Sequence, residues 1–224
     1  MKQKRSILIL FAFALAVFFA YGANAAGDEL LLVNRENPLP EDYVPEDLVP
    51  LSEVIPEGMC TYEHEGILAE REAAEAWAEL LAAAREDGLS EWRFSEGYRT
   101  WEAQKELFDE SVQSCMDQYG MSKPQAAEAT AYLVAEPGTS EHHTGLAFDI
   151  TVPGEYFADT AQYLWMKQHC WEYGFILRYT DEKEDITGFM SEEWHYRYVG
   201  REHALRMRDL DMCLEEYTDF VNAE

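Results

Sequence analysis

Two short segments, far apart in the chain, place the strongest constraint on its fold. Residues 140–149 read SEHHTGLAFD, and residues 192–200 read EEWHYRYVG. They offer two imidazoles and a carboxylate as metal ligands, with a second carboxylate nearby to accept a proton. These four residues are His142, His195, Asp149 and Glu192. Three protein ligands leave one tetrahedral position of zinc open, as catalysis requires, whereas a structural site fills all four. We therefore expect a metal-dependent hydrolase whose fold brings the two segments together.

The spacing of the first two ligands restricts the local structure. His142 and Asp149 are seven residues apart, and side chains at an odd separation in one straight strand point to opposite faces. Both can face one ion only if the chain bends between them. Gly145 is suited to such a bend. We therefore expect His142 in a turn and Asp149 in the strand that follows.

The second segment has the composition of a strand. Residues 194–199 are aromatic and β-branched. Strand alternation places His195 and Arg197 on one face and the aromatic side chains on the other. Glu192 would then lie just before the strand, three residues from His195, where the chain can turn it toward the metal.

The rest of the sequence predicts helices early and strands late, without a regular βαβ alternation. This order favours the α+β class, with helices packed on a mainly antiparallel sheet in one small domain and the metal in a cleft. Hydrophobic residues make up 47% of the chain, which argues against a disordered chain. We expect helices at residues 65–85, 101–118, 123–134 and 158–173, from residue 201 and around 214–221, and strands at 30–33, 92–95, 147–152, 175–178, 186–190 and 194–199.

The beginning of the chain has the pattern of an export signal. A basic start precedes an apolar run at residues 7–20, and the small-x-small sequence Ala-Asn-Ala follows at 23–25. The run is shorter than the roughly 20 residues of a membrane-spanning helix, although an uncleaved anchor is the alternative. We expect a signal peptide at 1–25, an extended acidic segment at 26–59, and a catalytic domain at 60–224 that is secreted or extracytoplasmic.

The charge and the cysteines limit the partners and the cross-links. A net charge of −27 argues against binding to nucleic acid or to anionic membrane surfaces, and we expect a monomer without a stable membrane span. In an exported chain the four cysteines permit two disulfides, and buried free thiols are the alternative. The cysteines are Cys60, Cys115, Cys170 and Cys213.

The full strings of the two segments carry a family resemblance. The chain resembles zinc D-alanyl-D-alanine carboxypeptidases of the VanY type, whose segments run S-x-H-x-x-G-x-A-x-D and E-x-W-H-x-R-Y-V-G. The likeness extends to residues 97–99 (GYR), 174–179 (GFILRY) and 186–188 (ITG), and covers most of residues 60–205. It implies a small α+β domain with Zn²⁺ in a cleft. It also implies removal of the terminal D-alanine from peptidoglycan stem peptides.

The resemblance also implies roles for individual residues. Three would bind zinc, one would act as the catalytic base, and an arginine would contact the substrate and polarise the scissile carbonyl. Two polar residues would line the substrate pocket. The zinc ligands would be His142, Asp149 and His195, and the catalytic base would be Glu192. The arginine would be Arg99, and the two pocket residues would be Ser140 and Gln104.

Three positions depart from the family pattern. His143 stands where the family commonly has glutamine, and it could compete with His142 as a ligand or recognise the substrate. Glu193 replaces the usual proline and places a second carboxylate beside Glu192. Glu96, in the sequence SEGYR, is also unusual and affects the position of the arginine that follows. We assign His142 and Glu192 because they keep the frame of the motifs.

The reaction has alternatives that the sequence leaves open. An L,D-carboxypeptidase acting on tetrapeptide stems, or an endopeptidase acting on cross-links, would use the same residues. A non-catalytic wall-binding domain with the same fold is another interpretation. The three intact ligands and Glu192 argue against it, because a binding module has little need of a base.

Overall fold

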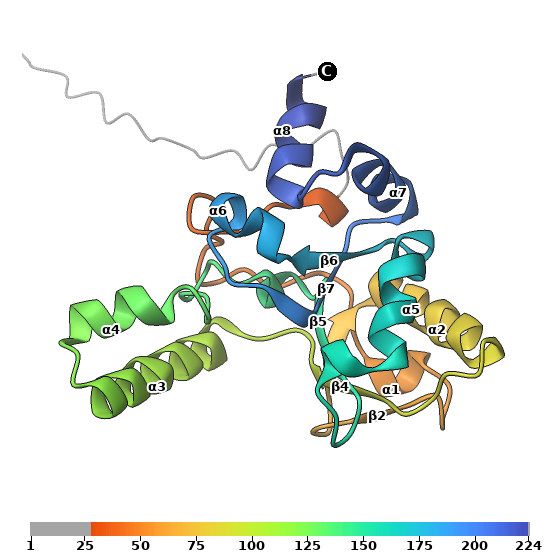
Figure 1. The fold of residues 1–224 in the computed structure, drawn as a ribbon, viewed down its shortest axis with the longest axis horizontal. Coiled ribbons are helices and arrows are strands. Elements are labelled where there is room, and N and C mark those ends of the chain that lie inside the picture. Colours follow the sequence, from red (N-terminus) through yellow and green to blue (C-terminus); the bar gives the residue numbers. More distant parts are fainter. Residues whose placement is uncertain (1–27, 224) are drawn as a thin grey trace, which may run out of the picture.

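The computed structural model describes residues 28–223, so the expected signal peptide lies outside the described residues (Figure 1). A five-stranded sheet lies at the centre, with strand order β2-β4-β5-β7-β6. Only the β2–β4 pair is parallel, and the other three pairs are antiparallel. The strands are β2 (Cys60–Tyr62), β4 (Trp92–Glu96), β5 (Ala147–Thr151), β6 (Phe175–Tyr179) and β7 (Glu192–Tyr198). The α+β class with a mainly antiparallel sheet is thereby confirmed.

The aromatic core lies between one face of this sheet and helix α2 (Arg71–Glu86). The helix is rich in alanine and leucine, and the Glu70 side chain caps its first turn by accepting from the Glu72 amide. The Trp77 indole lies in the middle, fully buried, with ring centroids 4.4 Å from Phe175 and 5.7 Å from Phe148. Helix α5 (Ala161–His169) and the 3₁₀-helix Cys170–Tyr173 complete this core.

Helices α3 (Trp101–Tyr119) and α4 (Lys123–Thr130) form a hairpin that projects from the sheet (Figure 1). They have a small apolar cluster of their own, formed by Phe108, Val112, Ala126 and Ala131. The Thr100 hydroxyl caps α3, and Gly120 ends it in the left-handed conformation at φ 66°. The hairpin therefore lies beside the sheet and has its own apolar cluster.

The two ends of the described chain meet at one side of the sheet. Helices α7 (Arg201–Leu210) and α8 (Leu214–Ala223) pack there with the buried Leu30 of the N-terminal segment. This segment contains the short helix α1 (Leu51–Val54) and strand β1 (Leu48–Pro50), which pairs with β3 (Leu68–Glu70). The domain boundary at residue 60 stays a prediction.

Two predicted strands are wrong. Leu30 ends a 3₁₀-helix (Asp28–Leu30), and residues 31–33 follow it as a loop, in which the Leu31 carbonyl accepts from the Arg197 side chain instead of joining a ladder. Residues 186–190 hold the end of helix α6 (Glu184–Thr187) and a loop. Gly188, at φ 73°, ends that helix.

Smaller differences concern the helix ends, the base and the cysteines. The helix predicted at residues 65–85 begins only at Arg71, because residues 68–70 form strand β3. Helix α4 ends earlier than expected, and the predicted helix at 158–173 is divided among a 3₁₀-helix (Phe157–Asp159), α5 and the 3₁₀-helix Cys170–Tyr173. Glu192 is the first residue of β7 and not a residue before it. All four cysteines lie in the described part of the chain, and all are free thiols there. No helix among residues 28–223 is both long and apolar enough to span a bilayer.

Candidate metal centre

The register of β5 and β7 places two of the predicted ligands side by side. Asp149 and His195 are directly opposite each other in the antiparallel ladder, so their side chains extend from the same face. Their neighbours Phe148 and Tyr196 face the aromatic core on the other side of the sheet. The His195 Nδ1 atom lies 3.0 Å from an Asp149 carboxylate oxygen.

The predicted turn brings the third ligand to the same place. His142 lies in a 3₁₀-helix (Glu141–Thr144) that Gly145 ends at φ 69°, as the odd spacing required. The Nδ1–H of its ring donates to the Gly97 carbonyl at 2.7 Å, so Nε2 faces Asp149 at 3.5 Å. One donor atom from each of His142, Asp149 and His195 lies within 4.8 Å of the others.

The neighbouring histidine has a different role. The Nδ1–H of His143 donates to the Arg99 carbonyl at 2.7 Å, and its Nε2 accepts from the Gly138 amide at 3.0 Å. Its ring also stacks on Trp101, with the centroids 6.0 Å apart. Because the backbone occupies both ring nitrogens, the geometry favours His142 as the ligand.

The two adjacent glutamates point to different surroundings. Glu192 lines the pocket with the three ligands, and its carboxylate lies 3.7 Å from His195 Nδ1. Burial raises the pKa of Glu192 to about 7, with His195 opposing the rise and Asp149 adding to it. Glu193 instead accepts from the Tyr156 hydroxyl at 3.2 Å. Of these two glutamates, only Glu192 therefore faces the candidate metal site.

The donor set and its charge fit a divalent cation. Burial alone would lower the pKa of His195, but the surrounding carboxylates of Asp149, Glu141 and Glu192 raise it to about 9. The pKa of Asp149 is lowered, because its contacts with His142 and His195 outweigh burial. Two imidazoles and one carboxylate are ligands that zinc prefers, and a cation would balance this excess of negative charge.

Arg99 is fixed at the edge of the same pocket. Its Nε and Nη2 atoms donate to one oxygen of Glu96 at 3.0 and 2.7 Å, and Nη1 donates to Gln104 at 2.8 Å. Gln104 is buried and its amide donates to the Ala135 carbonyl, so both ends of the amide are engaged. The unusual Glu96 thus holds the arginine. The Ser140 hydroxyl accepts from the His142 amide at 3.3 Å and supports the turn.

All seven predicted site residues line one cavity of about 200 Å³. They come from four parts of the chain that are separate in sequence: the loop after β4 together with the start of α3, the 3₁₀ turn before β5, strand β5 and strand β7. Apolar side chains form the remaining walls and include Leu107, Leu133 and Phe189. The residues that meet in the cavity are Arg99, Gln104, Ser140, His142, Asp149, Glu192 and His195.

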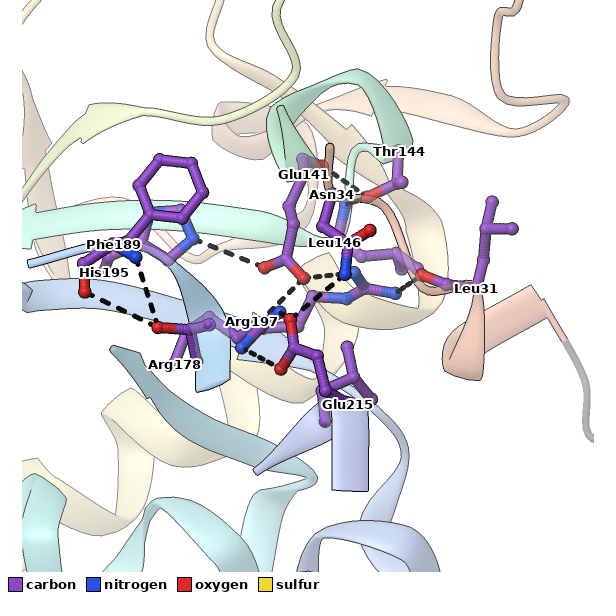
Figure 2. A network of polar contacts seen from close by, with 12 residues as sticks. Leu31, Asn34, Glu141, Thr144, Leu146, Arg178, Phe189, His195, Arg197 and Glu215 are labelled. Carbon is purple, nitrogen blue, oxygen red and sulfur yellow. Dashed lines mark hydrogen bonds and ion pairs between the residues drawn. The ribbon is translucent and has the colours of Figure 1, made fainter. Parts of the chain in front are cut away.

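Sequence reasoning missed one buried group beside the ligands. The side chain of Glu141 has no exposed surface and lies between Arg178, Arg197 and His195 (Figure 2). Its pKa is lowered, because the two guanidinium groups outweigh the effect of burial. The sequence held a signal, since two arginines in apolar strands require buried anionic partners.

Comparison with known proteins places this geometry in a family. A model of the D-alanyl-D-alanine carboxypeptidase family VanY matches residues 66–201. The chain is 40% identical over 199 residues to the D-alanyl-D-alanine carboxypeptidase of Enterococcus faecalis, which covers 87% of this chain and 69% of the relative.

Solved structures of similar proteins agree with this match. A vancomycin-resistance D,D-pentapeptidase VanY variant in complex with Zn(II) is 39% identical, with a TM-score of 0.71 over 85% of this chain and 98% of that one. VanYB in complex with D-alanine-D-alanine is 38% identical, with a TM-score of 0.73 over 85% and 97%. The LdcB LD-carboxypeptidase is 38% identical, with a TM-score of 0.69 over 84% of each chain.

The family model spans more than half of the sequence, and its match contains both segments that build the cavity. The chain therefore belongs to the VanY family of D-alanyl-D-alanine carboxypeptidases.

Proposed function

We propose that this protein is a zinc carboxypeptidase that removes the terminal D-alanine from peptidoglycan stem peptides. The observation that carries the proposal is the convergence of His142, Asp149 and His195 in one cavity with Glu192 and Arg99. Membership of the family supports the reaction. The similar VanYB, whose structure holds D-alanine-D-alanine, supports the substrate class.

The residues divide the chemistry of amide hydrolysis between them. Zinc bound by the three ligands would polarise a carbonyl and lower the pKa of water from 15.7 to about 7. Glu192 faces the same cavity, and its carboxylate would take a proton from the attacking water and deliver it to the leaving amine of D-alanine.

Arg99 supplies the fixed donors. A guanidinium has five N–H groups, and Glu96 and Gln104 engage three of them, which leaves two for the substrate. These would stabilise the oxyanion or bind the terminal carboxylate of the stem peptide. Losing one preorganised donor to a developing oxyanion typically costs about 3–4 kcal/mol of transition-state stabilisation.

An L,D-carboxypeptidase is the second candidate, because the LdcB LD-carboxypeptidase is as similar in sequence as VanYB. It would act on tetrapeptide stems with the same metal and base. An endopeptidase acting on cross-links and a wall-binding module without activity remain the further alternatives. One substrate series distinguishes all four.

The test is digestion of purified pentapeptide, tetrapeptide and cross-linked stems by the zinc-loaded protein, with products identified by mass. We expect the pentapeptide to lose one D-alanine, and a chelator to abolish the loss. Cleavage of the tetrapeptide alone would favour the L,D activity, and cleavage of cross-links would favour the endopeptidase. Binding without any product would contradict the catalytic proposal.

We also propose that the protein works outside the cytoplasm as a monomer. The basic start, the apolar run at residues 7–20 and the Ala-Asn-Ala sequence support export. Fractionation of cells that express the full chain, with mass determination of the exported form, tests the cleavage after residue 25. Sedimentation of that form tests the oligomeric state.

A further inference from the structure

We propose that Glu141 is a positioning residue that holds His195 in the orientation and tautomer needed for metal binding. This inference rests on the proposed zinc chemistry. Figure 2 shows Glu141 between Arg178, Arg197 and His195. One carboxylate oxygen accepts from Arg178 Nε at 2.8 Å and from Arg197 Nη1 at 3.1 Å. The other oxygen lies 3.6 Å from His195 Nε2.

The two facing atoms are matched to each other. Within the described part of the chain, Glu141 Oε2 and His195 Nε2 are both buried without a hydrogen-bond partner. Buried polar atoms are seldom left so, because an unmade hydrogen bond is costly. A shift of the ring by a few tenths of an ångström would convert this ion-pair contact into a hydrogen bond.

The direction of the ring gives this contact a consequence for metal binding. His195 presents Nδ1 to Asp149 at 3.0 Å and to Glu192 at 3.7 Å, so Nδ1 is the atom on the side of the metal ligands. An imidazole that binds a metal through Nδ1 keeps its proton on Nε2. Glu141 Oε2 is the acceptor for that proton, and such carboxylate–histidine pairs fix the tautomer and orient the ring.

The carboxylate itself is held in place by two arginine side chains. Arg178 also binds Glu215 on α8 through two bonds of 2.9 and 2.6 Å. The Nη2 atom of Arg197 donates to the carbonyls of Glu29 and Leu31 in the N-terminal segment. Two guanidinium groups thus balance two carboxylates in a buried network. Residues near both ends of the described chain hold the two arginines, and the arginines in turn keep the Glu141 carboxylate oriented toward His195.

Replacing the carboxylate by its amide gives a specific prediction. In Glu141→Gln the amide oxygen must face the two arginine donors, so the NH₂ group faces His195 Nε2. An NH₂ group cannot accept the Nε2 proton and instead favours the tautomer with the proton on Nδ1. That tautomer blocks the atom that faces the metal. We expect the zinc dissociation constant to rise about 10- to 100-fold.

A matched control separates positioning from a structural ion pair. Glu215→Gln removes a carboxylate from the same arginine but leaves Glu141 and its contact with His195 in place. Both variants should lose stability, because each removes a negative charge that is paired with Arg178 in this buried network. Only Glu141→Gln should weaken zinc binding, and Glu215→Gln should change the dissociation constant less than about threefold.

The experiment measures zinc affinity by competition with a chromophoric chelator, in the wild type and both variants of the full chain. Histidine nitrogen NMR of the zinc-loaded wild type should show the His195 proton on Nε2. Wild-type affinity in Glu141→Gln, or a proton on Nδ1, would overturn the inference. If Glu141→Gln does not fold, the NMR result alone decides. A wild type that binds no zinc would instead overturn the proposed function, and this inference with it.

Discussion

Glu192 is the residue on which the proposed chemistry most directly depends. We expect Glu192→Gln to keep zinc binding and lower turnover by about two to four orders of magnitude, because the amide cannot take a proton. Glu193→Gln is the control variant, since Glu193 contacts Tyr156 and does not line the cavity. Steady-state kinetics on a stem pentapeptide checks both variants, and near-normal D-alanine release by Glu192→Gln would remove it from the role of base.

The two adjacent histidines give the second test at this scale. His142→Ala should lose stoichiometric zinc, because it removes one of three ligands. His143→Ala should retain zinc, although it leaves the Gly138 amide and the Arg99 carbonyl without their partners and costs about 1–3 kcal/mol of stability. Metal analysis and denaturant unfolding measure the two effects. The reverse pattern of zinc loss would reassign the ligand.

Single residues were predictable where chemistry and spacing act together. The seven-residue separation of His142 and Asp149 required a bend, and Gly145 was the residue suited to it. Glu141 could not be chosen in this way, because an exposed carboxylate and a buried one look the same in a sequence this acidic. Its role depends on a distance of 3.6 Å to His195 that only the fold sets.

At the scale of elements, the turn before β5 positions the first ligand, and its glycine can be tested. Gly145→Ala would place a methyl at a positive φ, 2.9 Å from the Leu48 side chain and 3.0 Å from the Glu70 amide nitrogen. We expect a loss of more than about 1–2 kcal/mol, the cost of the backbone conformation alone, and weaker zinc binding because His142 moves.

Gly154 is the matched control for this prediction. It has φ +81°, and a methyl group added there would meet no atom within 4 Å, so Gly154→Ala carries only the cost of the backbone conformation. Denaturant unfolding of the zinc-free proteins gives the difference in stability, and chelator competition gives the zinc affinity. Equal stability losses and unchanged zinc affinity in both variants would show that the turn tolerates a side chain.

Elements were predictable where one physical cause dominates. Helix α2 has a continuous apolar stripe and the sequence of β7 alternates, so both were predictable, although α2 begins at Arg71 and not at residue 65, because residues 68–70 form β3. The segment 30–33 is equally apolar, yet its backbone binds the Arg197 side chain instead of a neighbouring strand. The strand predicted at residues 186–190 was wrong for another reason, since Gly188 ends a short helix there. Such outcomes depend on distant partners that local patterns do not contain.

The whole molecule places its polar site on one sheet face and its aromatic core on the other. Phe148 and Tyr196 pack around Trp77, while Asp149 and His195, their neighbours in the same strands, extend to the cavity. The core therefore fixes the backbone from which two ligands project. The third proposed ligand enters from a turn held by Gly97, so metal binding would join segments that are distant in sequence.

Metal binding should for this reason stabilise the entire fold. A ligand that binds only the native state adds about 4 kcal/mol to the free energy of unfolding when its free concentration is about 1,000 times the dissociation constant. For a domain of this size that corresponds to a rise in Tm of about 8–16 °C. Calorimetry with zinc and with a chelator measures the rise.

Glu192→Gln should show the full rise in Tm, because the base is not a ligand, and His142→Ala should show almost none. An equal rise in His142→Ala would mean that zinc stabilises the protein from some other place, and the cavity between β5 and β7 would no longer explain it.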